Sequence, residues 1–329
     1  MLERLSQLGR RPLPYDMFDH QRFGLEARNA KTLERIYHKG QERIWDGREV
    51  LAGLIAKHGP PRLDDKRKQA LGRLFAMIMW GELAAWKVSA ALADELEPFE
   101  AKLAATSQTF DEARHFYVMH DYLTALGAMP ERLDRGAETL LSAITDADHL
   151  SKKLIGMQLM IEPVALTIFQ LVRRMDVEPV LTGLMPYYER DEARHVALGV
   201  KYLPAMIRQM SLRERVELWG FQMRAVTFEL WGSIGLMRDL KTLGIDPRIA
   251  ADTGRAKQMK ALQLMLEEMG VSSTLPVQLL DRYGQVLLEA LIPVDDDRLR
   301  RRLRRMAHAA WRGTALIETD IEPDVAPPA

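Results

Sequence analysis

The chain has 329 residues, of which 47% are hydrophobic and 28% charged, and its formal net charge is zero. This composition is ordinary for a globular protein and provides no basic field for nucleic acid or an anionic membrane. The absence of cysteine excludes disulfides, cysteine-ligated iron–sulfur clusters and a rubredoxin-type four-cysteine site. We expect a cytoplasmic protein, because the N-terminus lacks the apolar core of a secretion signal and no run of about 18 uncharged apolar residues occurs.

The sequence predicts an all-α protein, because strand-type alternation is missing and Ala, Leu, Met, Arg and Glu dominate. We expect an N-terminal arm (1–26), a single helical domain (27–320) and a disordered tail (321–329). The second and third predicted helices are separated by a break at Glu97-Pro98, and the third ends at about residue 126. The other predicted helices, with the second, span 27–57, 65–95, 131–146, 149–175, 178–208, 211–243, 254–269, 275–291 and 296–318. The pairs 65–126 and 149–208 should form a four-helix bundle from one repeat used twice.

The pentapeptide Asp-Glu-Ala-Arg-His occurs twice, at residues 111–115 and 191–195. Within each copy Glu and His stand three positions apart, so that they project from one face of a helix. A single Glu in an apolar stretch lies 30 positions before the Glu of each copy: Glu82 before Glu112, and Glu162 before Glu192. The two halves of the bundle therefore carry the same pattern of ionisable residues.

Together these positions provide four carboxylates and two imidazoles, the ligand set of a di-iron or manganese/iron site in a four-helix bundle. The alternative is a pair of solvated helix faces with local ion pairs. The apolar neighbours Phe75–Trp80 and Leu159–Leu166 argue against it, because a carboxylate buried there is costly unless it is paired or bound to a metal. The predicted metal ligands are Glu82, Glu112, His115, Glu162, Glu192 and His195.

The pentapeptides also contain candidates for orienting the ligands. Asp111 and Asp191 each lie four residues before the His of their own copy, where each carboxylate can accept the ring N–H that a metal does not use. Arg114 lies three residues after Asp111, and Arg194 three residues after Asp191, so each arginine can hold the carboxylate of its own pentapeptide ionised. Ordinary ion pairs within each helix are the alternative for all four residues.

Two further positions leave alternatives open. Pro163 follows a predicted ligand inside a helix, and it is either a tolerated kink or part of a local bulge that lets Glu162 shift its coordination. His149, in Asp146-Ala-Asp-His149, has the spacing of a ligand pair but stands where a helix should begin, so we expect it to act as a cap.

The repeated motif resembles the ferritin-like di-iron oxidase superfamily over about residues 65–208. Its members include ribonucleotide reductase small subunits, related ligand-binding oxidases, bacterial multicomponent monooxygenases, acyl-carrier desaturases and arylamine N-oxygenases. The resemblance implies a ferritin-like four-helix bundle with additional N- and C-terminal helices, two iron ions or one manganese and one iron as cofactor, and O2 as co-substrate.

No subfamily is matched cleanly. Met119 stands where the reductase subunits carry their radical tyrosine, and Ala84 and Met157 stand where the ligand-binding oxidases carry cross-link partners. Tyr188 occupies the position of the third His of N-oxygenases. It is either a redox or hydrogen-bonding neighbour of the site or a core tyrosine.

The resemblance therefore predicts an O2-activating oxidase or monooxygenase for an apolar or aromatic small molecule, including carrier-linked ones. We expect a reductase or ferredoxin as electron donor, and neither nucleic acid nor a membrane as partner. The sequence leaves open whether the protein forms a homodimer. The alternatives are a ferroxidase or peroxide-scavenging ferritin-like protein, which the extra residues 209–329 and the missing Cys disfavour, and a non-catalytic scaffold with a structural metal site. Arg298–Arg305 holds six Arg and forms a solvated face or a docking patch.

Overall fold

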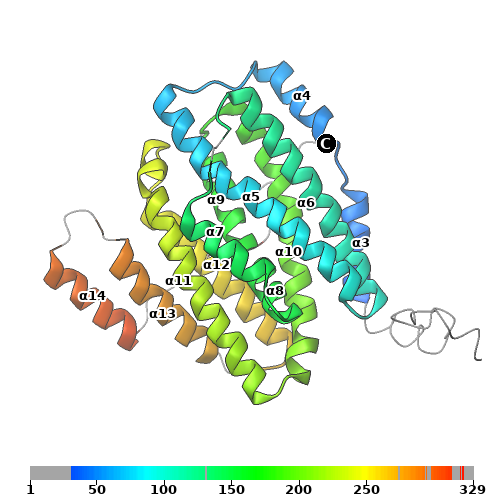
Figure 1. Cartoon of the computed structure of the whole chain (residues 1–329), viewed down its shortest axis with the longest axis vertical. Coiled ribbons are helices and arrows are strands. Elements are labelled where there is room, and N and C mark those ends of the chain that lie inside the picture. The colour runs from blue at the N-terminus through cyan, green and yellow to red at the C-terminus, as the bar shows by residue number, and fades with distance from the viewer. Residues whose placement is uncertain are drawn as a thin grey trace, which may run out of the picture.

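The computed structural model describes residues 31–129, 132–272, 275–292 and 298–312, with residues 294, 319 and 321. This part of the chain contains helices and no strand (Figure 1), which confirms the all-α prediction. The predicted arm and nearly all of the predicted tail lie outside the described residues. The helices are α3 (Lys31–Glu42), α4 (Gly47–His58), α5 (Asp65–Glu95), α6 (Phe99–Leu126), α7 (Arg135–Thr145), α8 (Leu150–Gly156), the π-helical turn η1 (Met157–Ile161), α9 (Glu162–Arg174), α10 (Pro179–Gln209), α11 (Leu212–Thr242), α12 (Pro247–Glu268), α13 (Leu275–Leu291) and α14 (Leu299–Arg312).

Two long hairpins form the bundle. Helices α5 and α6 lie side by side, and the continuous run from α8 through η1 to α9 packs against α10 (Figure 1). The short connection around Glu97-Pro98 turns the chain back on itself, and Gly127 ends α6 in the left-handed conformation at φ 66°. Helices α3 and α4 pack on α6 and α10, while α7, α11 and α12 cover the other side. This is the predicted ferritin-like bundle with additional helices.

The predicted single helix over 27–57 is wrong within the described residues, where α3 and α4 are separate. Asp46 begins α4 by accepting hydrogen bonds from the backbone N–H groups of Arg48 and Glu49. Trp45, in the break, is buried. The cap and the buried indole together redirect the chain, and neither produces a break in the apolar periodicity of the sequence.

Two C-terminal boundaries also differ from the prediction. Helix α12 begins at Pro247, well before residue 254, because Asp246 caps it and proline suits the first helical position. Helix α14 covers Leu299–Arg312 of the predicted 296–318, and residues 313–318 lie outside the described part of the chain.

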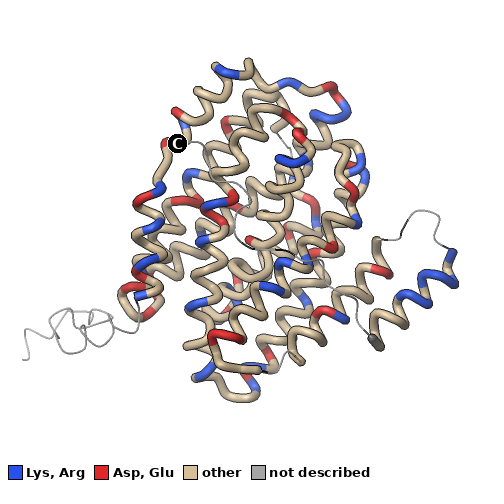
Figure 2. Tube along the Cα trace, turned by 180° about the vertical axis from the view of Figure 1, so that it is seen from behind, with Lys and Arg blue, Asp and Glu red and all other residues tan. Residues whose placement is uncertain are grey.

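The Arg-rich run lies on α14 at the edge of the molecule, where Figure 2 shows basic residues along the helix. Arg302 and Arg305 both reach Glu289 of α13, at 2.9 Å to its backbone oxygen and 2.7 Å to its carboxylate. Arg300 and Arg304 are exposed. The run is thus partly an anchor for α14 and partly a solvated face, and a docking role stays a prediction.

Of the two alternatives left open at Pro163, the structure shows the local bulge, as the π-helical turn η1. Pro163 has no backbone N–H, so the helix cannot keep its regular hydrogen bonds there. Instead the N–H of Glu162 donates to the carbonyl of Met157, five residues back. Such single turns are frequent at functional sites. Whether this turn lets Glu162 change its coordination stays a prediction.

One described stretch, Leu150–Arg174, is long and apolar enough to cross a membrane by length and composition, with a mean hydropathy of 1.6. Glu162 interrupts it, and 78% of its apolar window is buried inside the structure. A central helix of a globular fold has these properties, and this stretch forms one wall of the bundle core.

Helices α7 and α11 cross at two glycines. A Cβ atom added at Gly136 would lie 2.6 Å from the Cα and N atoms of Gly232, closer than van der Waals contact allows. This close approach fixes how α7 lies on α11, and both helices line the pocket described below.

We predict that Gly136→Ala lowers the free energy of unfolding by about 1–3 kcal/mol, because the methyl group overpacks the α7–α11 crossing. Urea denaturation followed by circular dichroism measures the change. Gly53→Ala in α4 is the matched control, since its Cβ would meet nothing within 4 Å and should stabilise the helix by about 0.5–1 kcal/mol. Equal shifts for both variants would contradict the proposed crossing.

Candidate metal centre

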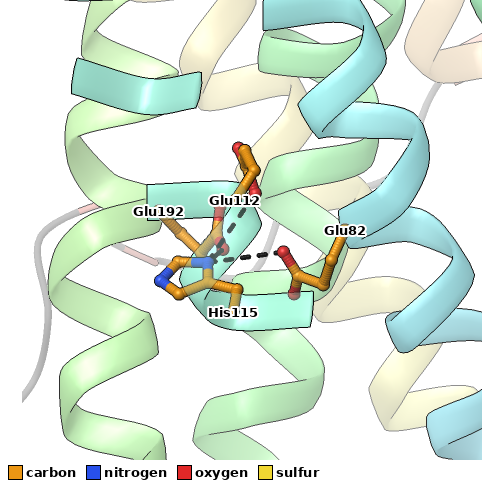
Figure 3. A group of neighbouring side chains, drawn as sticks. All are labelled: Glu82, Glu112, His115 and Glu192. Carbon is orange, nitrogen blue, oxygen red and sulfur yellow. Dashed lines mark ion pairs between the residues drawn. The ribbon is translucent and has the colours of Figure 1, made fainter. Parts of the chain in front are cut away.

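The structure brings all six predicted ligands together in the core of the bundle. Each of them is at most 4% exposed. They form two overlapping groups whose ligand atoms lie within 4.8 Å of one another, and Glu112 and Glu192 belong to both groups. The first group is completed by Glu82 and His115 (Figure 3), and the second by Glu162 and His195.

The spacing within the cluster suits metal ions. His115 Nδ1 lies 3.2 Å from Glu192 Oε1 and 3.3 Å from Glu82 Oε2. His195 Nδ1 lies 3.0 Å from Glu112 Oε1 and from Glu192 Oε2. An octahedral ion with bonds of about 2.1 Å holds neighbouring ligand atoms about 3.0 Å apart. Because one oxygen of Glu112 or Glu192 faces each imidazole, both carboxylates are placed to bridge two ions.

Several atoms of the cluster have no hydrogen-bond partner among the described residues. His115 Nδ1, Glu112 Oε2 and Glu192 Oε1 are all buried and make no hydrogen bond, although Nδ1 lies 3.7 Å and 3.2 Å from the two oxygens. Such orphaned polar groups are rare in folded proteins. Two such oxygens within ion-pair distance of one imidazole nitrogen fit a cation that accepts a lone pair from each of the three atoms. The cluster can therefore hold two metal ions, and a solvated-face interpretation of the motif is wrong.

Without metal, the cluster balances its own charge. Burial, reinforced by repulsion from Glu192, raises the pKa of Glu82 and Glu162 well above the usual value, so both tend to hold a proton. Burial alone would raise the pKa of Glu192, but a hydrogen bond from Glu162 and the charge of His195 lower it to about 2. Despite burial, the imidazoles also hold the pKa of Glu112 below its usual range.

The two imidazoles complete this balance. Burial by itself would lower the pKa of His115 and His195, but the carboxylates around each ring outweigh it and raise both pKa values well above 6.5. Two imidazolium ions then offset two carboxylates, while the other two carboxyl groups are neutral. Metal ions must replace these protons, since only deprotonated ligands bind them.

The aspartates contact the imidazoles across the bundle and not along their own helices. His115 Nε2 is 3.3 Å from Asp191 Oδ2, and His195 Nε2 is 3.4 Å from Asp111 Oδ2. The predicted pairing within each pentapeptide is therefore wrong. Once the Nδ1 atom of each ring points into the cluster, its Nε2 atom points toward the facing helix, where the other aspartate lies.

The two arginines of the motif tie the aspartates together. Arg114 pairs with Asp111 at 2.5 Å and with Asp191 at 2.8 Å, and Arg194 pairs with both at 2.7 Å. Burial opposes ionisation of Asp191, yet the His115 hydrogen bond and the two arginines hold its pKa well below the usual value. The predicted ion pairs within each helix exist, and each is doubled by one between α6 and α10.

Sequence reasoning missed Trp45 and left the role of Tyr188 open. The Trp45 indole N–H donates to Asp191 Oδ2 at 2.7 Å, and its ring lies 4.7 Å from the guanidinium of Arg114. The Tyr188 hydroxyl donates to the backbone oxygen of His115, and its ring stacks on the imidazole with centroids 4.4 Å apart. Tyr188 is thus a hydrogen-bonding neighbour that fixes the His115 ring.

Two buried glutamines were also missed. Gln108 Nε2 donates to Glu112 Oε1 at 2.9 Å and to Glu162 Oε1 at 3.2 Å. Gln158 Nε2, from η1, donates to Gln108 Oε1 at 3.1 Å. A signal existed in the sequence, because each glutamine stands four positions before a ligand glutamate and so shares its helix face.

The remaining candidates are structural. His149 caps α8 by accepting from the backbone N–H of Ser151, as predicted. Ala84, Met119 and Met157, which replace functional residues of the related subfamilies, are buried in the hydrophobic core.

An apolar pocket opens beside the cluster between α5, α7, η1, α9 and α11. Its lining includes the ligands Glu82 and Glu162, and most other wall atoms are apolar. Met77 and Met157 belong to this wall. The pocket is narrow, with a cavity volume of about 70 Å³. A slender molecule placed there would lie directly against two metal ligands.

No known family profile matches the sequence, and no curated protein matches it. Among solved structures the chain is similar to a mutant R2-like ligand-binding oxidase with an aerobically reconstituted Mn/Fe cofactor. The TM-score is 0.49 and the identity 16%, over 73% of this chain and 93% of that one. A similarity of this size carries no functional weight. The bundle and its cluster of four Glu and two His have the ligand arrangement that is typical of ferritin-like di-metal carboxylate proteins.

The charge balance predicts a pH dependence. His115, His195, Glu82 and Glu162 all have pKa values raised by folding, so they stabilise the metal-free fold at low pH and this contribution is lost as pH rises through those values. Chelator-treated protein should therefore melt at lower temperature as pH rises above neutral, and added metal should reverse the loss while releasing up to four protons. Metal-free stability that does not change with alkaline pH would contradict this charge state.

Proposed function

We propose that the protein is an O2-activating di-metal oxidase or monooxygenase that acts on an apolar or aromatic small molecule, including carrier-linked ones. The observation that carries the proposal is the apolar pocket that reaches Glu82 and Glu162, two of the six clustered ligands. A purely structural metal site needs no such pocket.

The ligand assignment follows the two groups in the core. Glu82 and His115 would hold one ion, Glu162 and His195 would hold the other, and Glu112 and Glu192, which belong to both groups, could serve either ion. Mixed carboxylate and imidazole ligands favour iron over magnesium or calcium, so the cofactor is two iron ions or one manganese and one iron. When bound, this metal pair supplies the electrons that reduce O2, the co-substrate.

The protein's own residues hold the ligands in the orientation that this chemistry requires. Asp191 and Asp111 accept the Nε2–H of the imidazoles, which leaves both Nδ1 atoms for the metals. Gln108 donates to Glu112 and Glu162 and so restricts the oxygens that these carboxylates turn toward the ions. The apolar pocket wall excludes water from the side on which a substrate would bind.

We further propose a reductase or ferredoxin as electron donor, a cytoplasmic location, no nucleic acid or membrane partner, and a chain that acts alone or as a homodimer. The zero net charge is compatible with each of these. A ferroxidase or peroxide-scavenging role is the main competitor, since it would use the same ligands without an organic substrate.

One experiment separates the two enzymatic functions. Aerobically isolated protein from iron-replete cells should contain about two transition-metal ions per chain, chiefly iron. Chelated protein reloaded with excess Fe(II) should oxidise a stoichiometric amount with O2 and then wait for a reductant, as followed by absorbance and an oxygen electrode. Glu112→Ala, which removes a bridging ligand, should lose both metals and keep its helical content.

Continued Fe(II) oxidation with growth of a mineral core, unaffected by any apolar compound, would instead establish the ferroxidase. Zinc alone at one ion per chain, or global unfolding of Glu112→Ala, would favour a structural site.

The crossed contacts predict which imidazole each aspartate serves. Asp191→Asn should weaken metal affinity by about 10–100-fold through His115. In competitive metal titrations, adding His115→Gln to Asp191→Asn should then cost less than the sum of the single changes, because both act on one ligand. Adding His195→Gln should give additive losses. Additive losses with His115→Gln and less than additive losses with His195→Gln would indicate that each aspartate serves the His of its own pentapeptide.

A further inference from the structure

One acidic residue of the pocket is not part of the metal cluster. Glu229, on α11, lines the pocket together with Glu82 and Glu162. It also lines a smaller adjoining cavity between α11 and α12, which Glu82 and Glu162 do not reach. Met77, Val164 and Ser233 belong to both walls. Glu229 therefore lies where the pocket adjoins this second cavity.

The carboxylate of Glu229 has no cationic partner in the described part of the chain. None of the ion pairs there includes it, and its side chain is held by one hydrogen bond, from Gln258 Nε2 to Oε2 at 2.6 Å. Its other oxygen accepts no hydrogen bond from a described residue. Glu229 is half-buried, and its apolar surroundings raise its pKa to about 7 against the effect of that hydrogen bond. A lone carboxyl group in an apolar wall is costly unless something pairs with it.

Glu229 is nevertheless held in a fixed place. Gln258, on α12, donates from the same amide nitrogen to the backbone oxygen of Met160 in η1 at 3.0 Å. The amide thus joins α11 to the π-helical turn that precedes Glu162. With Oε2 bound to Gln258, the second oxygen is the one available to a ligand in the pocket.

The nearby charges leave this carboxylate unbalanced. Four ligand glutamates offset two divalent ions, and Asp111 and Asp191 are paired with Arg114 and Arg194. Nothing in that arrangement compensates Glu229. A protonated nitrogen would do so, whereas a second carboxylate would be repelled and a hydroxyl would bring no charge.

We propose that Glu229 binds the ammonium group of an amine substrate whose slender apolar chain extends from it along the pocket toward Glu82 and Glu162. This rests on the proposed function, in that the pocket serves the metal centre. It adds the chemical class of the substrate and its direction: nitrogen at α11, carbon chain at the metals.

The test is equilibrium binding to the Fe(II)-loaded protein without O2, so that no turnover occurs. The probes are octylamine, 1-octanol and octanoate, which share a chain and differ in the head group. We expect octylamine to bind at least about ten-fold tighter than octanol, as for a hydrogen-bonded charged group, and octanoate to bind most weakly. Equal binding of the three probes would overturn the proposal.

Glu229→Gln keeps the shape of the side chain and removes its charge. It should abolish the preference for octylamine and leave octanol binding unchanged. Glu217→Gln, the same change at an exposed position of α11, is the matched control and should keep the preference. An amine preference that survives in Glu229→Gln would overturn the assignment to this residue. If Glu229→Gln unfolds, two other measurements test the proposal. One is the ranking of the three probes on the wild-type protein, and the other is octylamine binding to Glu229→Asp, which should be weaker than to the wild type.

Metal content and O2 consumption are measured on the same samples. Two metals and normal O2 reaction without an amine preference would refute the amine site and leave the proposed function standing. An amine preference in protein that neither retains metals nor reacts with O2 would refute the proposed function and leave a binding pocket for amines.

Discussion

The burial of four carboxylates and two imidazoles in one bundle core is the constraint on which the rest of the structure depends. Each carboxylate there would cost several kcal/mol if it were ionised and alone. Protons solve the problem in the metal-free state, because two protonated imidazoles and two neutral carboxyl groups leave no net charge. Metal ions solve it by replacing those protons. Both solutions require the same six side chains at the same distances.

The second layer of charge keeps those side chains in place. Two aspartates and two arginines form four ion pairs, two within helices and two between α6 and α10. Since each aspartate also contacts the imidazole of the facing helix, neither half of the bundle can move without disturbing the other. Trp45 extends this network to the break between α3 and α4, which explains why that break is ordered around a buried indole.

The repeated pentapeptide was enough to predict four members of the cluster, because spacing along a helix decides which side chains share a face. Glu82 and Glu162 followed from the single Glu that stands 30 positions before each copy in an apolar stretch. The sequence also predicted the bounds of α5 to the residue. It failed for the aspartates, because spacing within one helix cannot show which atoms of the next helix lie opposite. It also missed the α3–α4 break, where a cap and a tertiary contact override the apolar pattern. Gln108 and Gln158 could have been found, since both repeat the four-residue offset from a ligand.

The two halves of the centre are equal in sequence motif but not in surroundings. The His115 half is packed tightly by Tyr188 and Trp45. The Glu162 half is bordered by two glutamines and follows the π-helical turn. That turn is in contact with Gln258, which also holds Glu229. A molecule bound at Glu229 would therefore contact a carboxylate that Gln258 ties to the turn before Glu162. This arrangement connects the proposed amine site, through a single amide, with the π-helical turn that precedes Glu162.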